Sequence, residues 1–208
     1  MEVDLKKENS KNIFFIMAAS LTASVFLQFG YKAVSNIADA AMAGGVSLML
    51  SAVLVMLANI IPHGIKHKIV FTRVKNELPA CRINKLCKSE PRVEYEALKS
   101  RWPEVFSEDK IDGSIRNSRW YQQIYKSVKD TPEVLQAHRS FLLYRDAFSG
   151  LLIIFIATLA WSAFGNAELT GKINNMVYLV QGAFLTISLI TARVFGNRFV
   201  VNAVVAAL

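Results

Sequence analysis

Cysteine is scarce in this sequence of 208 residues, which contains only Cys81 and Cys87. Two thiols inside one charged segment cannot build the disulfide framework of a small secreted module, nor a zinc site of four cysteines. His63 and His67 would share a helix face because they are four residues apart, but two ligands do not complete a metal site. We therefore predict free thiols, no metal and no cofactor.

Charged residues are also few, at 19% of the chain, whereas 53% of the residues are hydrophobic and the mean hydropathy is +0.31. This proportion of apolar residues is more than a soluble domain needs to fill its core, which argues against a soluble enzyme. Four runs contain no Asp, Glu, Lys or Arg, and they span residues 12–31, 40–65, 147–167 and 173–192. Each run is about long enough to cross a hydrocarbon core of ~30 Å as a helix.

The short motifs of common enzyme sites are missing as well. The sequence contains no nucleophile motif, Gly-rich phosphate loop, HExxH zinc motif or Rossmann fingerprint. The four apolar runs also lack the charged residues that proton relays and ion-coupled transporters place inside the membrane. We therefore predict a protein without catalytic residues, and a transporter is disfavoured.

Lysine and arginine are unevenly distributed among the segments that separate the apolar runs. Segment 66–146 contains seventeen of them against eleven Asp or Glu, and the tail 1–11 contains three more. The turns at 32–39 and 168–172 each carry one charge of either sign. Because basic segments stay in the cytoplasm, both termini and the middle segment are predicted to be cytoplasmic.

These observations predict an all-α membrane protein with four transmembrane helices and a helical cytosolic domain inserted between the second and third. The predicted segments are a cytosolic tail (1–11), transmembrane helices 1 and 2 (12–65), the cytosolic helical domain (66–146), transmembrane helices 3 and 4 (147–192) and a cytosolic C-terminal tail (193–208). An insert of this size is too long for a turn and is enough for a small domain.

The insert is predicted to be helical because its apolar residues recur mostly at helical spacing. One helix is expected to begin near Glu90 and to end at Pro103, and another is expected from Ser114 to Val128. A third should begin at Thr-Pro-Glu, residues 131–133, which is a typical helix start.

This third helix is predicted to run from Pro132 to about Phe164, a length of roughly 50 Å, so that it continues from the insert into the third span. The second span is expected to continue past Pro62 towards Glu77. A kink is expected at Pro62 because proline lacks the N–H that the helix requires.

Arg116, Arg119 and Trp120 combine guanidinium groups with an aromatic face, a combination that holds phosphates and stacks on bases. We predict that they contribute to a surface that receives a ligand or partner, either a nucleotide second messenger or a cytosolic protein. Direct nucleic-acid binding is not expected. The alternative is that Trp120 anchors the core of an amphipathic helix while both arginines face solvent or lipid.

A basic cluster follows the second span directly. It comprises Lys66, Lys68, Arg73 and Lys75, and we predict that it contacts anionic lipid headgroups. This role requires membrane lipid as the only partner.

Polar residues inside the apolar runs are informative because each costs free energy in lipid unless it is paired or hydrated. Ser20, Ser24 and Gln28 recur every four residues, and in the last run Asn174 and Gln181 are seven apart, the period of left-handed helix packing. Such stripes hold one helical bundle together, or they face a water-filled pore in a homo-oligomer. Ser20, Ser24 and Gln28 are the predicted lining of such a pore.

Short motifs flank the insert and follow the last span. They are Leu78-Pro79 followed by Arg82, Tyr144-Arg145-Asp146 leading to Gly150, and Arg193, Gly196, Asn197, Arg198 and Phe199. With these motifs in a layout of two spans, a basic insert and two more spans, the chain resembles the four-span effectors encoded in bacterial anti-phage systems.

The resemblance implies an oligomeric effector that permeabilises or depolarises the bacterial inner membrane when a cytosolic defence-system partner senses infection. The alternative is an accessory membrane scaffold, whose basic insert docks a cytosolic partner while the spans only anchor it. Loss of membrane potential on expression separates these two hypotheses.

Overall fold

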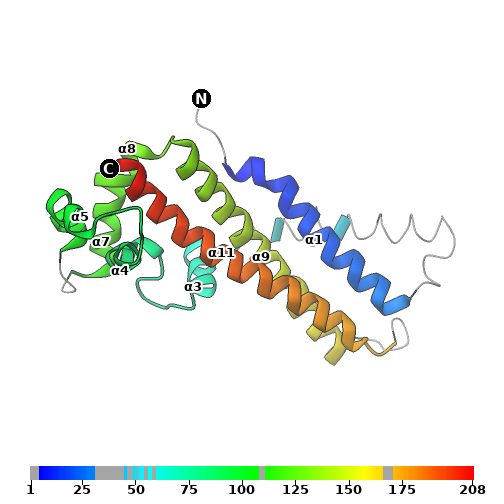
Figure 1. Cartoon of the computed structure of the whole chain (residues 1–208). Coiled ribbons are helices and arrows are strands. Elements are labelled where there is room, and N and C mark those ends of the chain that lie inside the picture. Colours follow the sequence, from blue (N-terminus) through cyan, green and yellow to red (C-terminus); the bar gives the residue numbers. More distant parts are fainter. Residues whose placement is uncertain are drawn as a thin grey trace. The chain divides into compact units, whose positions relative to one another are not determined.

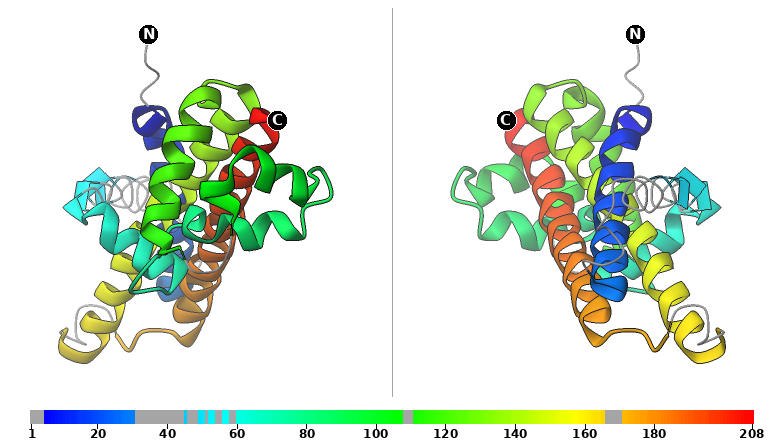
Figure 2. Two further views of the ribbon diagram at one scale, coloured as in Figure 1. Left: turned by 90° about the vertical axis from the view of Figure 1, so that its left-hand side faces the viewer. Right: turned by 90° about the vertical axis from the view of Figure 1, so that its right-hand side faces the viewer.

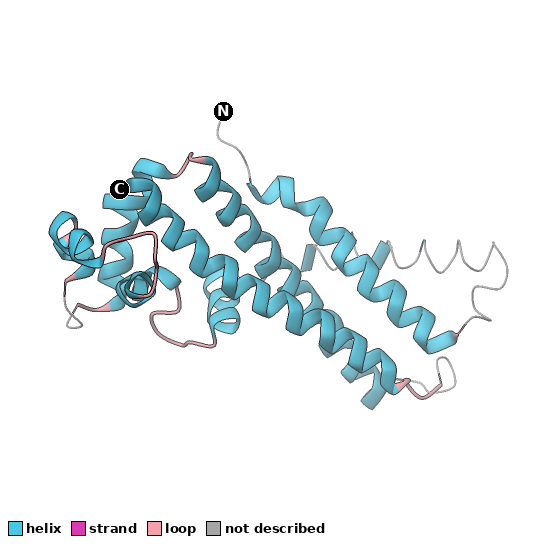
Figure 3. Ribbon diagram, viewed as in Figure 1, coloured by secondary structure: helices cyan, strands magenta, loops and turns pink. Residues whose placement is uncertain are grey.

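The computed structural model describes residues 5–30, 45, 49–50, 52–53, 56–57, 60–107, 111–165 and 171–208. Within these ranges all regular elements are helices and no strand occurs, as Figures 1 and 3 show. The prediction of an all-α protein is therefore confirmed for the described part of the chain.

Among the described residues, three helices are long and apolar enough to span a membrane, which indicates a membrane-embedded protein. They are α1 (Leu5–Phe29, apolar from Glu8), α9 (Pro132–Phe164) and α11 (Asn175–Ala207). Half of the predicted span at 40–65 lies outside the described residues, so the structure supports three candidate spans and does not establish four.

The limits of α9 agree with the prediction from its sequence. The helix begins at Pro132 and ends at Phe164, and the N–H of Leu135 donates to the carbonyl of Thr131 at 2.9 Å. Proline suits the first helical position because the N–H that it lacks would have no partner inside the helix. This helix start depends on adjacent residues only, which is why the sequence reveals it.

The chain divides into two compact units. The first unit contains Met1–Lys66 and Leu143–Ile190, and the second contains His67–Leu142 and Thr191–Leu208. The helices α9 and α11 each contribute residues to both units. These units are defined by packing, whereas the predicted segments are defined by the side of the membrane, so the membrane topology stays a prediction.

In the first unit, α1 packs beside the parts of α9 and α11 that belong to it (Figure 2). Ile13 and Met17 of α1 are buried against Leu151 and Ile154 of α9. A Cβ atom on Gly150 would lie 2.6 Å from the sulfur of Met17, so glycine permits the close approach of these two helices. The contact is the small-residue packing that membrane helices favour.

The outer faces of these helices carry exposed apolar side chains. Examples are Phe15 on α1, Ile156 and Leu159 on α9, and Leu179 and Ile187 on α11. Exposed apolar surface of this extent is unfavourable in water and suits contact with lipid tails.

The second unit consists of short helices packed on the C-terminal part of α11. Besides α3 (His63–Phe71), which begins in the first unit, they are η2 (Pro79–Arg82), α4 (Ile83–Lys88), α5 (Tyr95–Arg101), α6 (Pro103–Phe106), α7 (Gly113–Trp120), η3 (Tyr121–Tyr125) and α8 (Lys126–Val128). Leu98, Val105 and Ile124 are fully buried in the core of this unit with Val200 and Val204 of α11. The unit therefore has a hydrophobic core of its own.

Two predicted helix limits in this region are corrected by the structure. The helix expected near Glu90 begins only at Tyr95, because the Glu90 carboxylate accepts hydrogen bonds from the backbone and side chain of Arg92 and stabilises a turn instead. The helix expected to continue from Pro62 towards Glu77 ends at Phe71. The predicted helical stretch from Ser114 to Val128 is confirmed, as α7, η3 and α8 follow one another directly.

Candidate functional site

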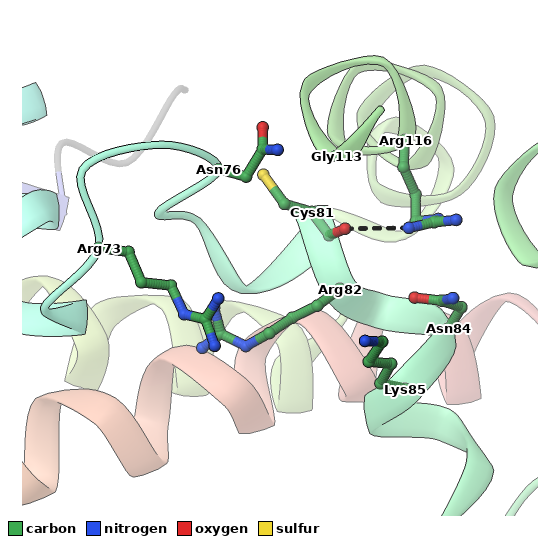
Figure 4. Close-up of a pocket in the computed structure, with 8 residues that line it drawn as sticks. All are labelled: Arg73, Asn76, Cys81, Arg82, Asn84, Lys85, Gly113 and Arg116. Atoms are coloured by element: carbon green, nitrogen blue, oxygen red, sulfur yellow. Dashed lines mark hydrogen bonds between the residues drawn. The ribbon is translucent and has the colours of Figure 1, made fainter. Parts of the chain in front are cut away.

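The second unit contains a cavity of about 220 Å³ next to η2, α4 and α7. Its lining residues, drawn in Figure 4, are Arg73, Asn76, Cys81, Arg82, Asn84, Lys85, Gly113 and Arg116. Four of these eight described residues are cationic, and none is acidic. These eight residues form the basic cavity.

Backbone geometry places two sides of the basic cavity close together. Asn76 has a φ of +52°, a left-handed conformation that asparagine tolerates better than most residues. A Cβ atom on Gly113 would lie 2.7 Å from Cγ of Asn76, so the start of α7 can approach this turn only with glycine.

Asp112 precedes α7 as its N-cap and adds a carboxylate near the basic cavity. The carboxylate accepts hydrogen bonds from the backbone N–H and the hydroxyl of Ser114, at 2.8 and 2.6 Å. These hydrogen bonds lower the pKa of Asp112 below its usual value, so the carboxylate is ionised at neutral pH.

Arg116 forms the buried wall of the basic cavity. Its Nε donates to the carbonyl of Val105 at 3.1 Å, and its Nη1 donates to the carbonyl of Cys81 at 3.2 Å (Figure 4). The side chain is 5% exposed. Arg116 therefore joins η2, α6 and α7 and places a fixed positive charge behind the cavity.

Arg82 is a half-buried cation of the basic cavity with an incomplete set of hydrogen bonds. Its Nη2 donates to Oδ1 of Asn197 at 3.3 Å and its guanidinium lies 5.4 Å from the ring centre of Phe71, whereas within the described residues its buried Nη1 has no hydrogen-bond partner. Burial lowers the pKa of the Arg82 guanidinium, and the positive charges of Arg73 and Arg193 lower it further. The local field therefore disfavours a second cation and favours an anion.

Cys81 also lines the basic cavity, but its thiol is not poised for covalent chemistry. Burial raises its pKa, and the negative charge of Glu77 raises it further. The second free thiol, Cys87, is fully buried and has its pKa raised by burial to about 12. Both sulfurs therefore stay protonated at neutral pH, and a protonated thiol is a weak nucleophile and metal ligand.

The residues of the predicted receiving surface occupy different environments. Arg116 is in the wall of the basic cavity, whereas Arg119 lies at the surface, where its Nη1 donates to the carbonyl of Glu104 at 3.2 Å. Trp120 is 4% exposed and stacks on Tyr125 with ring centres 5.4 Å apart. Trp120 is thus a core residue, which is the alternative that the sequence allowed, and the receiving role of the arginines stays a prediction.

Two of the three predicted pore-lining residues, Ser24 and Gln28, form hydrogen bonds with other segments of the same chain. The hydroxyl of Ser24 donates to the carbonyl of Ser20, and Nε2 of Gln181 on α11 donates to Oγ of Ser24 at 3.0 Å. Gln28 donates to the carbonyl of Lys172 and accepts from the N–H of Asn174 at 2.8 Å. The structure therefore joins the two polar stripes into one hydrogen-bonded seam within the bundle.

A second polar group in the first unit is a buried ionic cluster. Nζ of Lys66 lies 2.9 Å from Oδ1 of Asp146, and the guanidinium of Arg145 donates to both oxygens of the same carboxylate at 3.0 and 3.1 Å. All three residues are nearly inaccessible to solvent. A buried carboxylate with two cationic partners is well compensated.

This cluster corrects the prediction for Lys66, which was expected to contact lipid headgroups with Lys68, Arg73 and Lys75. The ammonium of Lys66 is 1% exposed and faces a carboxylate inside the protein. The side chains of Lys68, Arg73 and Lys75 are exposed, so their contact with headgroups stays a prediction.

The basic cavity was missed as a site by sequence reasoning, although the density of cations around Cys81 is visible. Within the described part of the chain, no group of three His, Cys, Asp or Glu side chains could hold a metal ion. The described residues thus form a helical protein with three candidate membrane spans and with a basic cavity in its second unit. No protein-family model matches the chain, and no curated protein or solved structure matches it.

Proposed function

We propose that this protein is a non-enzymatic, homo-oligomeric effector of the bacterial inner membrane that permeabilises or depolarises the membrane when its second unit receives a cytosolic infection signal. The observation that carries the proposal is the continuity of α9 and α11, which contribute residues both to the unit with the candidate spans and to the unit with the basic cavity. A continuous helix has no loop to absorb a displacement, so a change at one end biases the other.

The interior of the first unit also supports an effector that changes its packing. Its seam consists of hydroxyl and amide groups, such as Ser24 and Gln181, which can exchange a protein partner for water. In a homo-oligomer, a shift of α1 against α11 would expose this seam to a central axis. The predicted pore would then be lined by Ser20, Ser24 and Gln28 and would discriminate weakly between ions, because these residues carry no charge.

The test measures membrane permeability of the full chain directly. Purified protein is reconstituted in vesicles that contain a potential-sensitive dye, and its mass is measured in nanodiscs. The expected result is an oligomer that dissipates an imposed potential, while vesicles without protein keep theirs. A strict monomer that leaves the potential intact contradicts the proposal.

The orientation part of the proposal, with both termini and the second unit in the cytoplasm, needs an introduced cysteine. The native thiols are both buried, so we expect neither to react with an impermeant maleimide added on either side. Cysteine in place of exposed Lys129 should react only after cells are permeabilised, whereas cysteine in place of exposed Lys172 should react in intact cells. The reverse pattern contradicts the proposed orientation.

A second candidate function is an accessory scaffold that docks a cytosolic partner through its basic insert. The seam favours it, because Ser24 and Gln28, two of the three predicted pore residues, form hydrogen bonds within one chain without an oligomer. The two functions differ in one measurable consequence: a scaffold leaves the membrane potential unchanged on overproduction, whereas an effector lowers it.

A further inference from the structure

The basic cavity concentrates positive charge, and none of its described lining residues is acidic. Arg73, Arg82, Lys85 and Arg116 line it, and Arg193 is close enough to lower the pKa of Arg82. The nearby carboxylates, Glu77 and Asp112, are not among the lining residues, and Asp112 already accepts two hydrogen bonds from Ser114.

The four cations lie at different depths in the cavity. Arg116 is buried and fixed by two carbonyls, Arg82 is half-buried and its Nη1 has no hydrogen-bond partner among the described residues, and Arg73 and Lys85 are exposed. In Figure 4, Arg73 and Arg82 extend toward one another from the loop after α3 and from η2. Cations that converge from several elements can surround an anion from more than one side.

The size of the cavity restricts what can enter it. Cavities that enclose a drug-sized molecule have volumes of about 300–1,000 Å³. At about 220 Å³ the basic cavity is smaller, so it holds one compact group with its water and leaves the rest of a larger molecule outside.

The donor chemistry favours a tetrahedral oxyanion of high charge. Guanidinium groups present fixed N–H donors that match phosphate oxygens, and lysine acts as a mobile point charge beside them. The amides of Asn76 and Asn84 lie in the same lining and are neutral groups that can donate to an oxygen. A carboxylate has one charge and two oxygens, and it therefore satisfies fewer of these donors than a phosphate monoester does.

We infer that the basic cavity binds a phosphate monoester dianion, with Arg73, Arg82 and Lys85 as its ligands and Arg116 as the fixed charge behind them. The consequence of binding rests on the proposed function, in which this cavity receives the activating signal. The binding itself does not depend on it. The phosphate can come from a soluble phosphorylated molecule or from a lipid headgroup, and the same chemistry recognises both.

The first experiment measures binding of inorganic phosphate to the full chain in a non-ionic detergent, at constant ionic strength and with acetate as the comparison anion. Saturable binding of phosphate is expected, and acetate should bind at least about tenfold more weakly. The double variant Arg73→Gln/Lys85→Gln should weaken phosphate binding about tenfold or more, because hydrogen bonds to a charged group are lost. Both side chains are exposed, so the variant should fold.

The matched control is Arg198→Gln/Lys129→Gln, which also removes one exposed arginine and one exposed lysine of the second unit, outside the cavity. It should bind phosphate like the wild type. Absence of saturable binding overturns the inference, and so does an equal loss in the control variant or no loss in the cavity variant.

The second experiment distinguishes the two sources of phosphate. Nanodiscs of phosphatidylcholine are compared with nanodiscs that also contain phosphatidic acid, whose headgroup is a phosphate monoester. If the headgroup occupies the cavity, phosphatidic acid should weaken the apparent binding of inorganic phosphate several-fold in the wild type and not in the cavity variant. Equal binding in both nanodiscs assigns the site to a soluble ligand. Vesicle permeability is measured separately, so failure of the effector function and failure of phosphate binding remain distinguishable.

Discussion

Charge gathers in two places in this protein, and the two places differ in how it is compensated. In the first unit, Lys66 and Arg145 share the carboxylate of Asp146, and all three side chains are buried. In the second unit, four cations surround the basic cavity without an acidic residue in its lining. A buried charge destabilises the fold unless it is paired, whereas a charge at a hydrated opening is solvated by water and is accessible to a ligand. The comparison therefore separates a cluster that holds the fold from one that is suited to binding.

The largest expected effect is loss of the carboxylate in the buried cluster. Asp146→Asn keeps the shape but leaves Lys66 and Arg145 without their shared counter-charge, which should lower the free energy of unfolding by about 3–5 kcal/mol. Reversible unfolding in mixed micelles measures this change. Glu133→Gln, an exposed change on the same helix, is the control and should cost less than about 1 kcal/mol. A loss of that small size at Asp146 would mean that water compensates the cluster.

A smaller effect is expected where α1 and α9 approach closely in the first unit. Gly150→Ala places a methyl group against the buried side chain of Met17 and should destabilise the protein by about 1–3 kcal/mol. Gly182 on α11 has no atom within 4 Å of the position of a Cβ, so Gly182→Ala should be neutral or stabilise by up to about 1 kcal/mol. If the two substitutions change the thermal midpoint equally, α1 and α9 are not in tight contact at Gly150.

The second unit should be selectively sensitive to alkaline pH. The pKa of Cys87 is raised by burial from 9.0 to about 12, so folding favours its protonated form. The stabilisation is complete below about pH 9 and is lost between pH 9 and 12, with a slope of about 1.4 kcal/mol per pH unit for one group. Burial also raises the pKa of Tyr125, so ionisation of this side chain adds to the loss of stability at alkaline pH.

This pH dependence can be assigned to one unit by fluorescence. Trp120 reports on the second unit and Trp161 on the first, so each is kept as the single tryptophan in turn. The signal of Trp120 should change first as the pH rises above 9. Cys87→Ala should flatten the dependence, and an unchanged slope in this variant would exclude the thiol as its cause.

The smallest effect is expected in the neutral seam of the first unit. Gln181→Leu removes the amide that donates to Ser24 and Thr158, at 3.0 and 3.1 Å. Hydrogen bonds between membrane helices contribute on average about 0.6 kcal/mol and at most about 1.7 kcal/mol, so a loss in this range is expected. Unfolding in the same micelles measures it, with Thr186→Val as the control, because Thr186 donates only to the carbonyl of Gly182 in its own helix. If Gln181→Leu leaves the free energy of unfolding unchanged but reduces conductance, the seam faces water.

Local features of the chain were predictable to the extent that neighbouring residues decide them. The start of α9 follows from the proline at 132, and no later proline interrupts the helix before its end at Phe164. The polar stripes follow from helical periodicity, although their meeting through Gln28 and Asn174 does not. The helix start at Tyr95 was misjudged because the pairing of Glu90 with Arg92 competes locally with the helix.

The basic cavity could not be predicted, because its residues are adjacent only in space. Arg73, Arg82 and Arg116 come from three elements, and the cavity forms where Asn76 adopts a left-handed conformation against Gly113. Composition indicates that the region is basic. It does not indicate which cations point into one space and which face solvent.

By itself, the sequence determined that this protein is helical and suited to a membrane, because apolar runs and helix-start residues act over one or a few turns. The tertiary structure decided how polar and charged groups are used. Lys66 became a buried partner of Asp146, eighty positions along the chain, Trp120 became a core residue, and Arg82 kept a donor without a hydrogen-bond partner among the described residues. Pairing and burial depend on which segments meet, and that is settled only when the whole chain packs.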